Sequence, residues 1–336
     1  MTVSTGILAP GSMSLVTTID ERFQSFDIAL PEPDAGASTP GAQVSSSAPA
    51  STTGARKPLR ASSRRPPSAS AGVANELADR RFRSLVRALS PMVLQVSGPS
   101  AARIYVPRHD EFPPRPPQGF DAVLPRELQP QVIDFAESIG ADLETIQTPP
   151  IGDAGLESAE ELLDPVEYVD RLGALARSGV SIAAHHALAT QEAPMQTSLI
   201  NEDDHTPRPA YWAALLWRRL MGTAVLDSGL HTIEGLHVYA HALRGLPEGV
   251  AALVVNTSPT ITRRLAVPID CVRYTLRADV SEGGALRLNG RLLSLSSEGS
   301  LPRLTGLPTR RGPLIFTPRS ITFLACPDAK RAPSSR

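Results

Sequence analysis

The chain has 336 residues, which allows one large domain or two domains of ordinary size. Its 33 basic and 34 acidic residues leave a formal net charge of −1, so the overall charge favours neither nucleic acid nor an anionic membrane as a partner. Aromatic residues make up only 4%, which is low for a surface that stacks on sugars or bases. The two cysteines, Cys271 and Cys326, exclude a disulfide-rich scaffold and leave a single disulfide open.

The sequence contains no clear targeting signal. No run approaches 18 apolar residues, so we expect no transmembrane segment. Residues 1–20 lack a basic start and a long apolar stretch, so they are not a convincing signal peptide. We therefore expect either a cytosolic protein or a chain whose true start is missing, and the compartment and the oligomeric state stay open.

The amino-terminal residues divide into a strand and a low-complexity segment. Partial alternation over 15–30 predicts a strand. Residues 31–72 hold 9 Ser, 9 Ala, 7 Pro and no aromatic residue, so they cannot bury enough surface to offset chain entropy, and we predict disorder. The arginines around Lys57 are consistent with a localisation or polyanion-binding patch, but a solvated linker is the favoured interpretation.

Residues 73–226 alternate between helical and strand patterns. Helical spacing predicts helices over 77–89, 130–139, 166–177 and 211–221, and short apolar runs predict strands over 92–96, 104–106, 143–146 and 180–184. The last of these strands ends at His185-His186. Such alternation implies a parallel sheet or a (β/α) barrel.

After Leu226 the apolar period changes from 3.6 to 2. Seven short strands are predicted, over 236–242, 250–256, 264–267, 272–276, 286–288, 292–295 and 321–325. Asn289-Gly290 between two apolar runs is a strong hairpin signal. The fold class is therefore α/β followed by all-β, with a β-sandwich over 227–327 and a disordered tail over 328–336.

Few residue clusters point to chemistry. His185 and His186 are adjacent on a strand and face opposite ways, so we expect no metal site, and no motif calls for a cofactor. Asp153 and Glu157 precede a helix in a loop where barrel enzymes place catalytic groups, and a retaining glycosidase needs two carboxylates about 5 Å apart. Helix caps and solvated loops also use these residue types, so spacing alone favours the structural interpretation.

Several segments resemble the heparanase family of glycoside hydrolases, glycoside hydrolase family 79. The most specific is 207–226, PRPAYWAALLWRRLMGTAVL, which is similar to the end of the family's barrel. Weaker similarities cover 19–26, 81–91, 94–98, 168–179, 199–203, 236–241 and 286–290. The resemblance implies a (β/α) barrel with a carboxy-terminal β-sandwich, and retaining hydrolysis of β-glucuronide links in glycosaminoglycan-like glycans. Members are mostly secreted, lysosomal or membrane-associated.

The chain departs from the family where the catalytic groups should be. The resemblance implies an acid that is the Glu of an Asn-Glu pair ending the fourth strand. Asn75-Glu76 opens the first helix and Asn201-Glu202 precedes the last, so neither matches, and a central barrel segment is missing. Gly152-Asp153 lies nearest to the expected nucleophile. His185-His186 replaces an Arg-Gln pair, and Ser198 aligns with a sugar-contacting Tyr.

The sequence thus predicts a reduced barrel, with its first strand within 1–30 and the remainder over 73–226, that has lost most of its activity. The weak catalytic candidates are Asp153 and Glu157, and by resemblance His186, Ser198 and Glu202 line the substrate groove. The expected partner is a glycan, and we expect no nucleic acid, cofactor or metal. Two alternatives stay open, which are a non-catalytic glycan- or partner-binding module and an incomplete gene model of an active enzyme.

Overall fold

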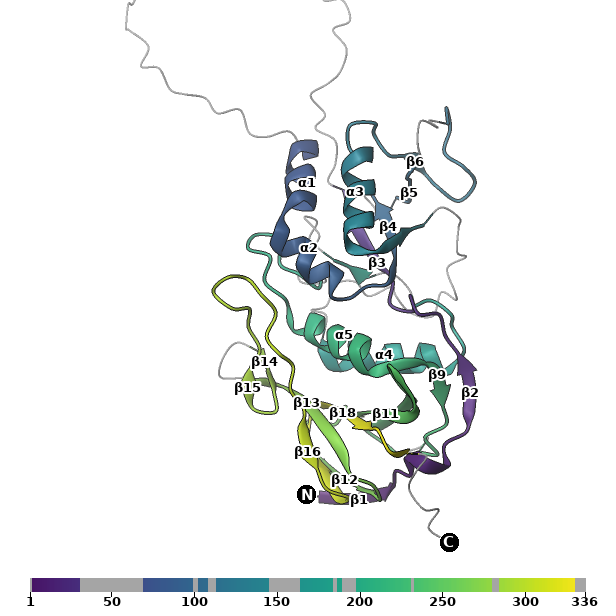
Figure 1. Cartoon of the computed structure of the whole chain (residues 1–336), viewed down its shortest axis with the longest axis vertical. Coiled ribbons are helices and arrows are strands. Elements are labelled where there is room, and N and C mark those ends of the chain that lie inside the picture. Colours follow the sequence, from purple (N-terminus) through teal and green to yellow (C-terminus); the bar gives the residue numbers. More distant parts are fainter. Residues whose placement is uncertain are drawn as a thin grey trace, which may run out of the picture.

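The computed structural model describes residues 2–30, 69–98, 102–107, 113–144, 164–183, 186–188, 198–230, 233–279 and 284–329. It has a helix-flanked parallel sheet at one end and a nine-stranded and a three-stranded sheet at the other, with two helices between them (Figure 1). None of the helices in these ranges is long and apolar enough to cross a membrane.

The parallel sheet has the strand order β7-β4-β3-β8, and each neighbouring pair is parallel. Its strands are β3 (Phe26–Ala29), β4 (Met92–Ser97), β7 (Ala141–Leu143) and β8 (His186–Ala187). A separate parallel pair consists of β5 (Ile104–Tyr105) and β6 (Ala122–Val123). Parallel strands need crossover connections, which contain α1 (Ala69–Ala78), α2 (Arg80–Arg87), α3 (Gln129–Ile139) and α4 (Pro165–Arg177). The described strands form an open sheet and no closed barrel.

Local sequence signals define the helix ends. The side chain of Asp79 caps α2 by accepting a hydrogen bond from the backbone N–H of Phe82, and Asp164 caps α4 in the same way. Gly140 ends α3 in the left-handed conformation, at φ 71°. These caps place the apolar faces of the helices against one core, in which Phe82 and Phe135 stack with ring centroids 5.6 Å apart.

The second part is built mainly of antiparallel strands. A nine-stranded sheet has the order β15-β14-β13-β18-β11-β10-β9-β2, with β16 paired to β13. These strands are β2 (Leu15–Thr18), β9 (Met221–Leu226), β10 (Leu236–Leu243), β11 (Leu246–Asn256), β13 (Cys271–Asp279), β14 (Ala285–Leu288), β15 (Arg291–Leu292), β16 (Leu307–Thr309) and β18 (Ser320–Cys326). A three-stranded sheet has the order β1-β12-β17, with β1 (Thr2–Ile7), β12 (Thr262–Val267) and β17 (Gly312–Phe316).

Both faces of the nine-stranded sheet are covered. Leu253 and Val255 of β11 belong to the core shared with α4 and α5 (Pro209–Leu220), whereas Ala252 and Val254 belong to the core shared with the three-stranded sheet. A strand buried on both faces has to be apolar throughout, which explains the uninterrupted apolar run at 250–255. The two helices therefore lie between this sheet and the parallel one (Figure 1).

The strand predicted over 15–30 is wrong as a single element. The structure has β2 and β3 with a turn between them, because the carboxylate of Asp20 accepts hydrogen bonds from the backbone and guanidinium of Arg22. Residues before this turn join the three- and nine-stranded sheets, since β1 pairs with β12 and β2 pairs with β9. Only the four residues of β3 enter the parallel sheet.

Three other predicted boundaries are corrected. Residues 31–68 lie outside the described ranges, but 69–72 begin α1 instead of belonging to a disordered segment. Residues 180–183 form no strand, because they bond to the turn before β3, and the strand starts at His186. In the predicted tail, Ala329 is fully buried against the core of the three-stranded sheet, and 330–336 lie outside the described ranges.

Candidate functional site

Three neighbouring parallel strands bring together Asp27, the second residue of β3, Ser97, the last residue of β4, and Glu144, which directly follows β7. The hydroxyl of Ser97 donates a hydrogen bond of 2.5 Å to Oδ2 of Asp27. The backbone N–H of Glu144 donates to the carbonyl of Leu94, at 2.9 Å, so Glu144 continues the register of the sheet. Ligands of open α/β sheets bind outside the carboxyl edge, so it is the first place to look for a site.

Asp27 has an unusual environment for a carboxylate. Burial raises the pKa of its carboxyl to about 6 from an ordinary 3.8, the hydrogen bond from Ser97 opposes the rise, and the charge of Glu144 adds to it. Its Oδ1 is buried and has no hydrogen-bond partner within the described part of the chain. A carboxyl group of this kind is partly protonated in mildly acidic solution and can donate a proton there.

Glu144 is in a different situation. Its side chain is only 3% exposed, and the Nη2 atom of Arg103 lies 3.2 and 3.3 Å from its two carboxylate oxygens. The Arg103 guanidinium also lies over the ring of Phe120, 5.8 Å from its centroid. Because a buried charge without a partner is very costly, the contact with Arg103 is the kind of partner that a buried carboxylate needs. Glu144 is therefore turned toward the protein and not toward an incoming ligand.

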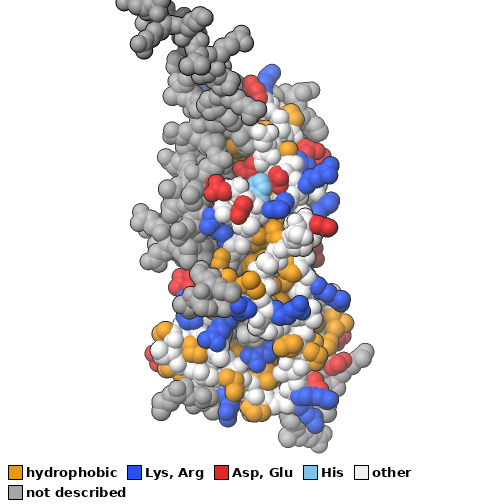
Figure 2. All heavy atoms as spheres, turned by 90° about the vertical axis from the view of Figure 1, so that its left-hand side faces the viewer, with side chains coloured by type: hydrophobic (Ala, Val, Ile, Leu, Met, Phe, Trp, Pro, Cys, Tyr) orange, Lys and Arg blue, Asp and Glu red, His pale blue; other side chains and the backbone are white. Residues whose placement is uncertain are grey.

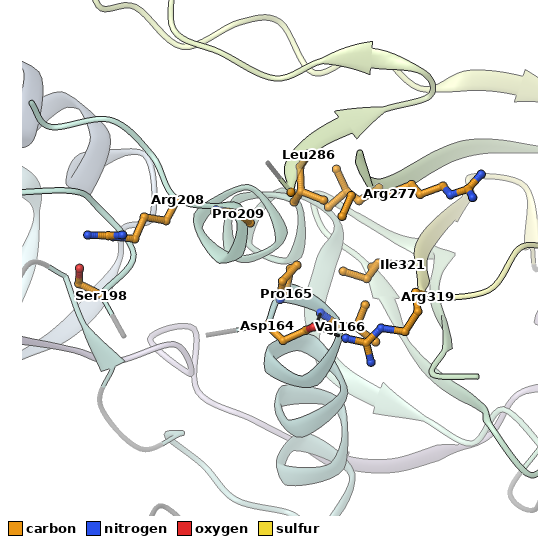
Figure 3. Close-up of a pocket in the computed structure, with 13 residues that line it drawn as sticks. Asp164, Pro165, Val166, Ser198, Arg208, Pro209, Arg277, Leu286, Arg319 and Ile321 are labelled. Carbon is orange, nitrogen blue, oxygen red and sulfur yellow. Dashed lines mark hydrogen bonds and ion pairs between the residues drawn. The ribbon is translucent and has the colours of Figure 1, made fainter. Parts of the chain in front are cut away.

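A pocket of about 390 Å³ lies between the first turns of α4 and α5 and the strands β13, β14 and β18. Figure 3 shows Ser198 and Arg208 at one end of it and Arg277 and Arg319 at the other. Arg319 forms an ion pair with Asp164, the residue that caps α4. The pocket is therefore rich in arginine, and one of its cations is already neutralised.

A second, open pocket of about 800 Å³ adjoins the first, and Arg277 lines both. Arg273 and Arg287 also line it, together with hydroxyl and amide side chains, and no Asp or Glu is among the described residues of its wall. Arginine side chains are grouped around the carboxy-terminal sheets on the face that carries β14 and β15 (Figure 2). Guanidinium groups recognise carboxylates and other oxyanions through paired hydrogen bonds, so the two pockets together suit an anionic ligand.

The predicted site residues are only partly placed. Asp153 and Glu157 lie outside the described residues, and of His186 the structure describes the backbone, which pairs with Phe26. Ser198 lines the arginine-rich pocket, but it is fully buried and its hydroxyl donates to the carbonyl of Ile200 at 3.0 Å.

Glu202 is not among the described residues that line the pocket of Ser198. Its charge, together with burial as the larger cause, raises the pKa of Glu76 in α1 to about 7. Among the described residues, no group of three His, Cys, Asp or Glu side chains is placed to hold a metal ion.

Sequence reasoning missed Asp27, Ser97 and Glu144 as a group. A signal was present only for Ser97, which directly follows the predicted strand over 92–96, where parallel strands expose functional groups. Treating 15–30 as a single strand hid Asp27, because it then counted as an interior strand residue.

Comparison with curated proteins identifies relatives of one kind. Heparanase-like protein 2 of Arabidopsis thaliana is 26% identical over 215 residues, which are 52% of this chain and 38% of that protein. Mouse heparanase is 28% identical over 183 residues, 49% of this chain and 33% of the relative. Baicalin-beta-D-glucuronidase of Scutellaria baicalensis is 28% identical over 115 residues, 32% of this chain and 21% of that enzyme.

These matches confirm the resemblance to heparanase-type glycoside hydrolases. This chain is a glycoside hydrolase-like protein, and it spans less than two fifths of the length of the curated relatives that it matches. No protein-family model matches it.

Solved structures give only a distant likeness. A family 44 endoglucanase of Clostridium has a TM-score of 0.33 at 13% identity, over 60% of this chain and 36% of that one. The α-L-arabinofuranosidase of Thermotoga maritima also has a TM-score of 0.33, at 12% identity, over 59% of this chain and 47% of that one. Scores of this size assign no fold.

Proposed function

We propose that the chain is a heparanase-like protein that binds an acidic, glucuronide-type glycan and hydrolyses it at no more than trace rates. The observation that carries this proposal is the state of the carboxylates at the carboxyl edge of the parallel sheet. Asp27 is bonded to Ser97 and Glu144 is buried against Arg103, so neither is presented as a free nucleophile.

The chemistry of retention explains why hydrolysis should fail. An acid and a nucleophile must flank one glycosidic bond about 5 Å apart. Asp27 has a pKa suited to an acid, but Glu144 would have to leave Arg103 to attack a sugar. Loss of one proton-transfer or nucleophilic group costs about 10²–10⁴-fold or more in rate.

Binding is supported by the arginine-lined pockets. Arg277 is exposed, lines both pockets and has no ion-pair partner within the described ranges. A glucuronate carboxylate can accept two parallel hydrogen bonds from such a guanidinium. The name of the Scutellaria relative, baicalin-beta-D-glucuronidase, fits a ligand of this class.

We also propose the finer architecture that the resemblance implies. The parallel sheet with its helices would be a reduced (β/α) barrel, and the nine- and three-stranded sheets would be the family's β-sandwich. The β-sandwich assignment is supported by one shared core. Leu265 and Phe316 of the three-stranded sheet and Val254 and Leu324 of the nine-stranded sheet belong to it. Residues 2–18 would then belong to the sandwich, since β1 and β2 pair there.

The experiment is a binding titration with an oligosaccharide of alternating glucuronate residues. Carboxyl-reduced oligosaccharide serves as the ligand control, because it keeps the shape and loses the charge. Arg277→Ala should weaken binding about tenfold, whereas Arg303→Ala, an exposed arginine that lines neither pocket, should not. Equal affinity for the charged and the reduced oligosaccharide would exclude the proposed recognition.

A second candidate function is residual hydrolysis with Asp27 as the proton donor. The raised pKa of its carboxyl favours this role. In that case Asp27→Asn should abolish whatever slow turnover is measured, and the double variant Asp153→Ala, Glu157→Ala should leave it unchanged.

A further inference from the structure

The only two cysteines of the chain are cross-strand neighbours. Cys271 is the first residue of β13 and Cys326 is the last residue of β18. These strands are antiparallel, and their register pairs Val272 with Ala325. Continuing this register by one residue places Cys271 opposite Cys326, although 54 residues separate them in the sequence.

The spacing of this pair suits a disulfide. Directly opposed residues of antiparallel strands have Cα atoms about 4.5 or 5.5 Å apart, and disulfides span Cα distances of about 4.4–6.8 Å. Opposed residues also direct their side chains to the same face of the sheet. Both cysteines belong to the core between the nine- and three-stranded sheets, and they are 5% and 0% exposed.

We propose that Cys271 and Cys326 form an intramolecular disulfide that links β13 to β18. Within the chain, each cysteine can pair only with the other, because the sequence contains only these two. The link would close a loop that contains β14, β15, β16 and β17. This inference is independent of the proposed glycan-binding function.

The reaction is thiol–disulfide exchange with a low-molecular-weight or protein disulfide. The thiol of Cys326 hydrogen-bonds to the sulfur of Cys271, which lowers the pKa of Cys271 and raises that of Cys326. Cys271 is therefore the better first nucleophile.

The electrons and protons balance over two steps. The Cys271 thiolate attacks one sulfur of the external disulfide, which forms a mixed disulfide and releases one thiol. Cys326 then loses its proton and attacks the sulfur of Cys271, which forms the protein disulfide and releases the second thiol. Two protein thiols are oxidised, and one external disulfide is reduced.

The position of the two cysteines allows an external oxidant to reach them. Asp270 precedes β13 and Pro327 follows β18, and both are exposed. The cysteines thus stand at the ends of their strands, which open most easily. The same reaction is available during folding, before the core closes.

The test uses the wild-type chain in glutathione buffers of graded disulfide-to-thiol ratio, followed by denaturation, alkylation and mass spectrometry. In oxidising buffer the chain should lose two hydrogen atoms and take up no alkylating agent. Trypsin should then release peptides 265–273 and 320–330 joined to each other. Reduction should restore two alkylated cysteines.

The apparent melting temperature should rise roughly 5 °C on oxidation. In Cys271→Ser it should not depend on the glutathione ratio. Any of three results in oxidising buffer would overturn the proposal, namely two alkylated cysteines, a disulfide between two chains, or a lasting glutathione adduct at either cysteine.

Discussion

The hydroxyl of Ser97 donates a 2.5 Å hydrogen bond to the carboxylate of Asp27, which joins the carboxyl end of β4 to β3. This contact fixes the side chain of Asp27 at the edge of the parallel sheet, and burial raises the pKa of its carboxyl to about 6. The charge of Asp27 therefore changes in mildly acidic solution.

Asp27 should make the stability of the protein depend on pH. Because its folded pKa of about 6 exceeds the ordinary 3.8, the folded state binds more protons than the unfolded state between these values. The contribution of Asp27 to stability is then fully present below pH 4 and is lost as the pH rises to about 6, a change of about 3 kcal/mol. Asp27→Asn should remove this pH dependence, whereas Asp203→Asn, at an exposed loop residue, should keep it. Denaturant unfolding from pH 4 to pH 8 measures the difference, and parallel curves for wild type and Asp27→Asn would refute it.

Arg103→Met should destabilise the protein strongly. It removes the Arg103 guanidinium from the Glu144 carboxylate, which is 3% exposed. Loss of one partner of a buried pair costs about 3 kcal/mol or more. The double variant Arg103→Met, Glu144→Gln should recover part of the loss, because it removes the buried charge. A single variant with unchanged unfolding midpoint would show that the pair contributes little.

The contact between α4 and β10 should not tolerate a methyl group at Gly173. A Cβ atom added there would lie 2.3 Å from the ring of Tyr239, and the hydroxyl of Tyr239 is held by Asp170 at 2.8 Å. Gly173→Ala should therefore cost about 2 kcal/mol. In a double-mutant cycle with Tyr239→Ala this cost should largely disappear, and additive effects would contradict the clash.

Gly290→Ala tests the hairpin between β14 and β15. Asn289 and Gly290 both have positive φ, 51° and 85°, and Leu288 pairs with Arg291 across the turn. Nothing lies within 4 Å of an added Cβ at Gly290, so only backbone strain remains, which costs about 1 kcal/mol. Thermal unfolding measures it, and a gain in stability would be inconsistent with this turn geometry.

Short-range sequence patterns predicted the turns and helix ends that short-range interactions determine. The cap at Gly140 and the turn at Asn289-Gly290 were readable because one residue type fits each conformation. The pairing of β1 with β12 was not readable, because 260 positions separate Thr2 from Thr262 and only tertiary packing brings them together. The two pockets likewise depend on strand register. Arg277 and Arg319 line the same pocket because β13 pairs with β18, where Arg277 is opposite Ser320.

The same limit of short-range patterns applies to the residues of the candidate site. Ser198 was selected through the resemblance and does line a pocket, whereas Asp27 and Glu144 come from strands that the sequence delimits poorly. Their proximity depends on the parallel order β7-β4-β3, which no short-range pattern encodes.

The most direct measurement is the turnover of an aryl β-glucuronide by the purified chain beside the double variant Asp153→Ala, Glu157→Ala. We predict that wild-type protein releases the aryl group at no more than trace rates and that the double variant behaves alike. Robust turnover that the double variant abolishes would contradict the proposal and would identify Asp153 and Glu157 as the catalytic pair.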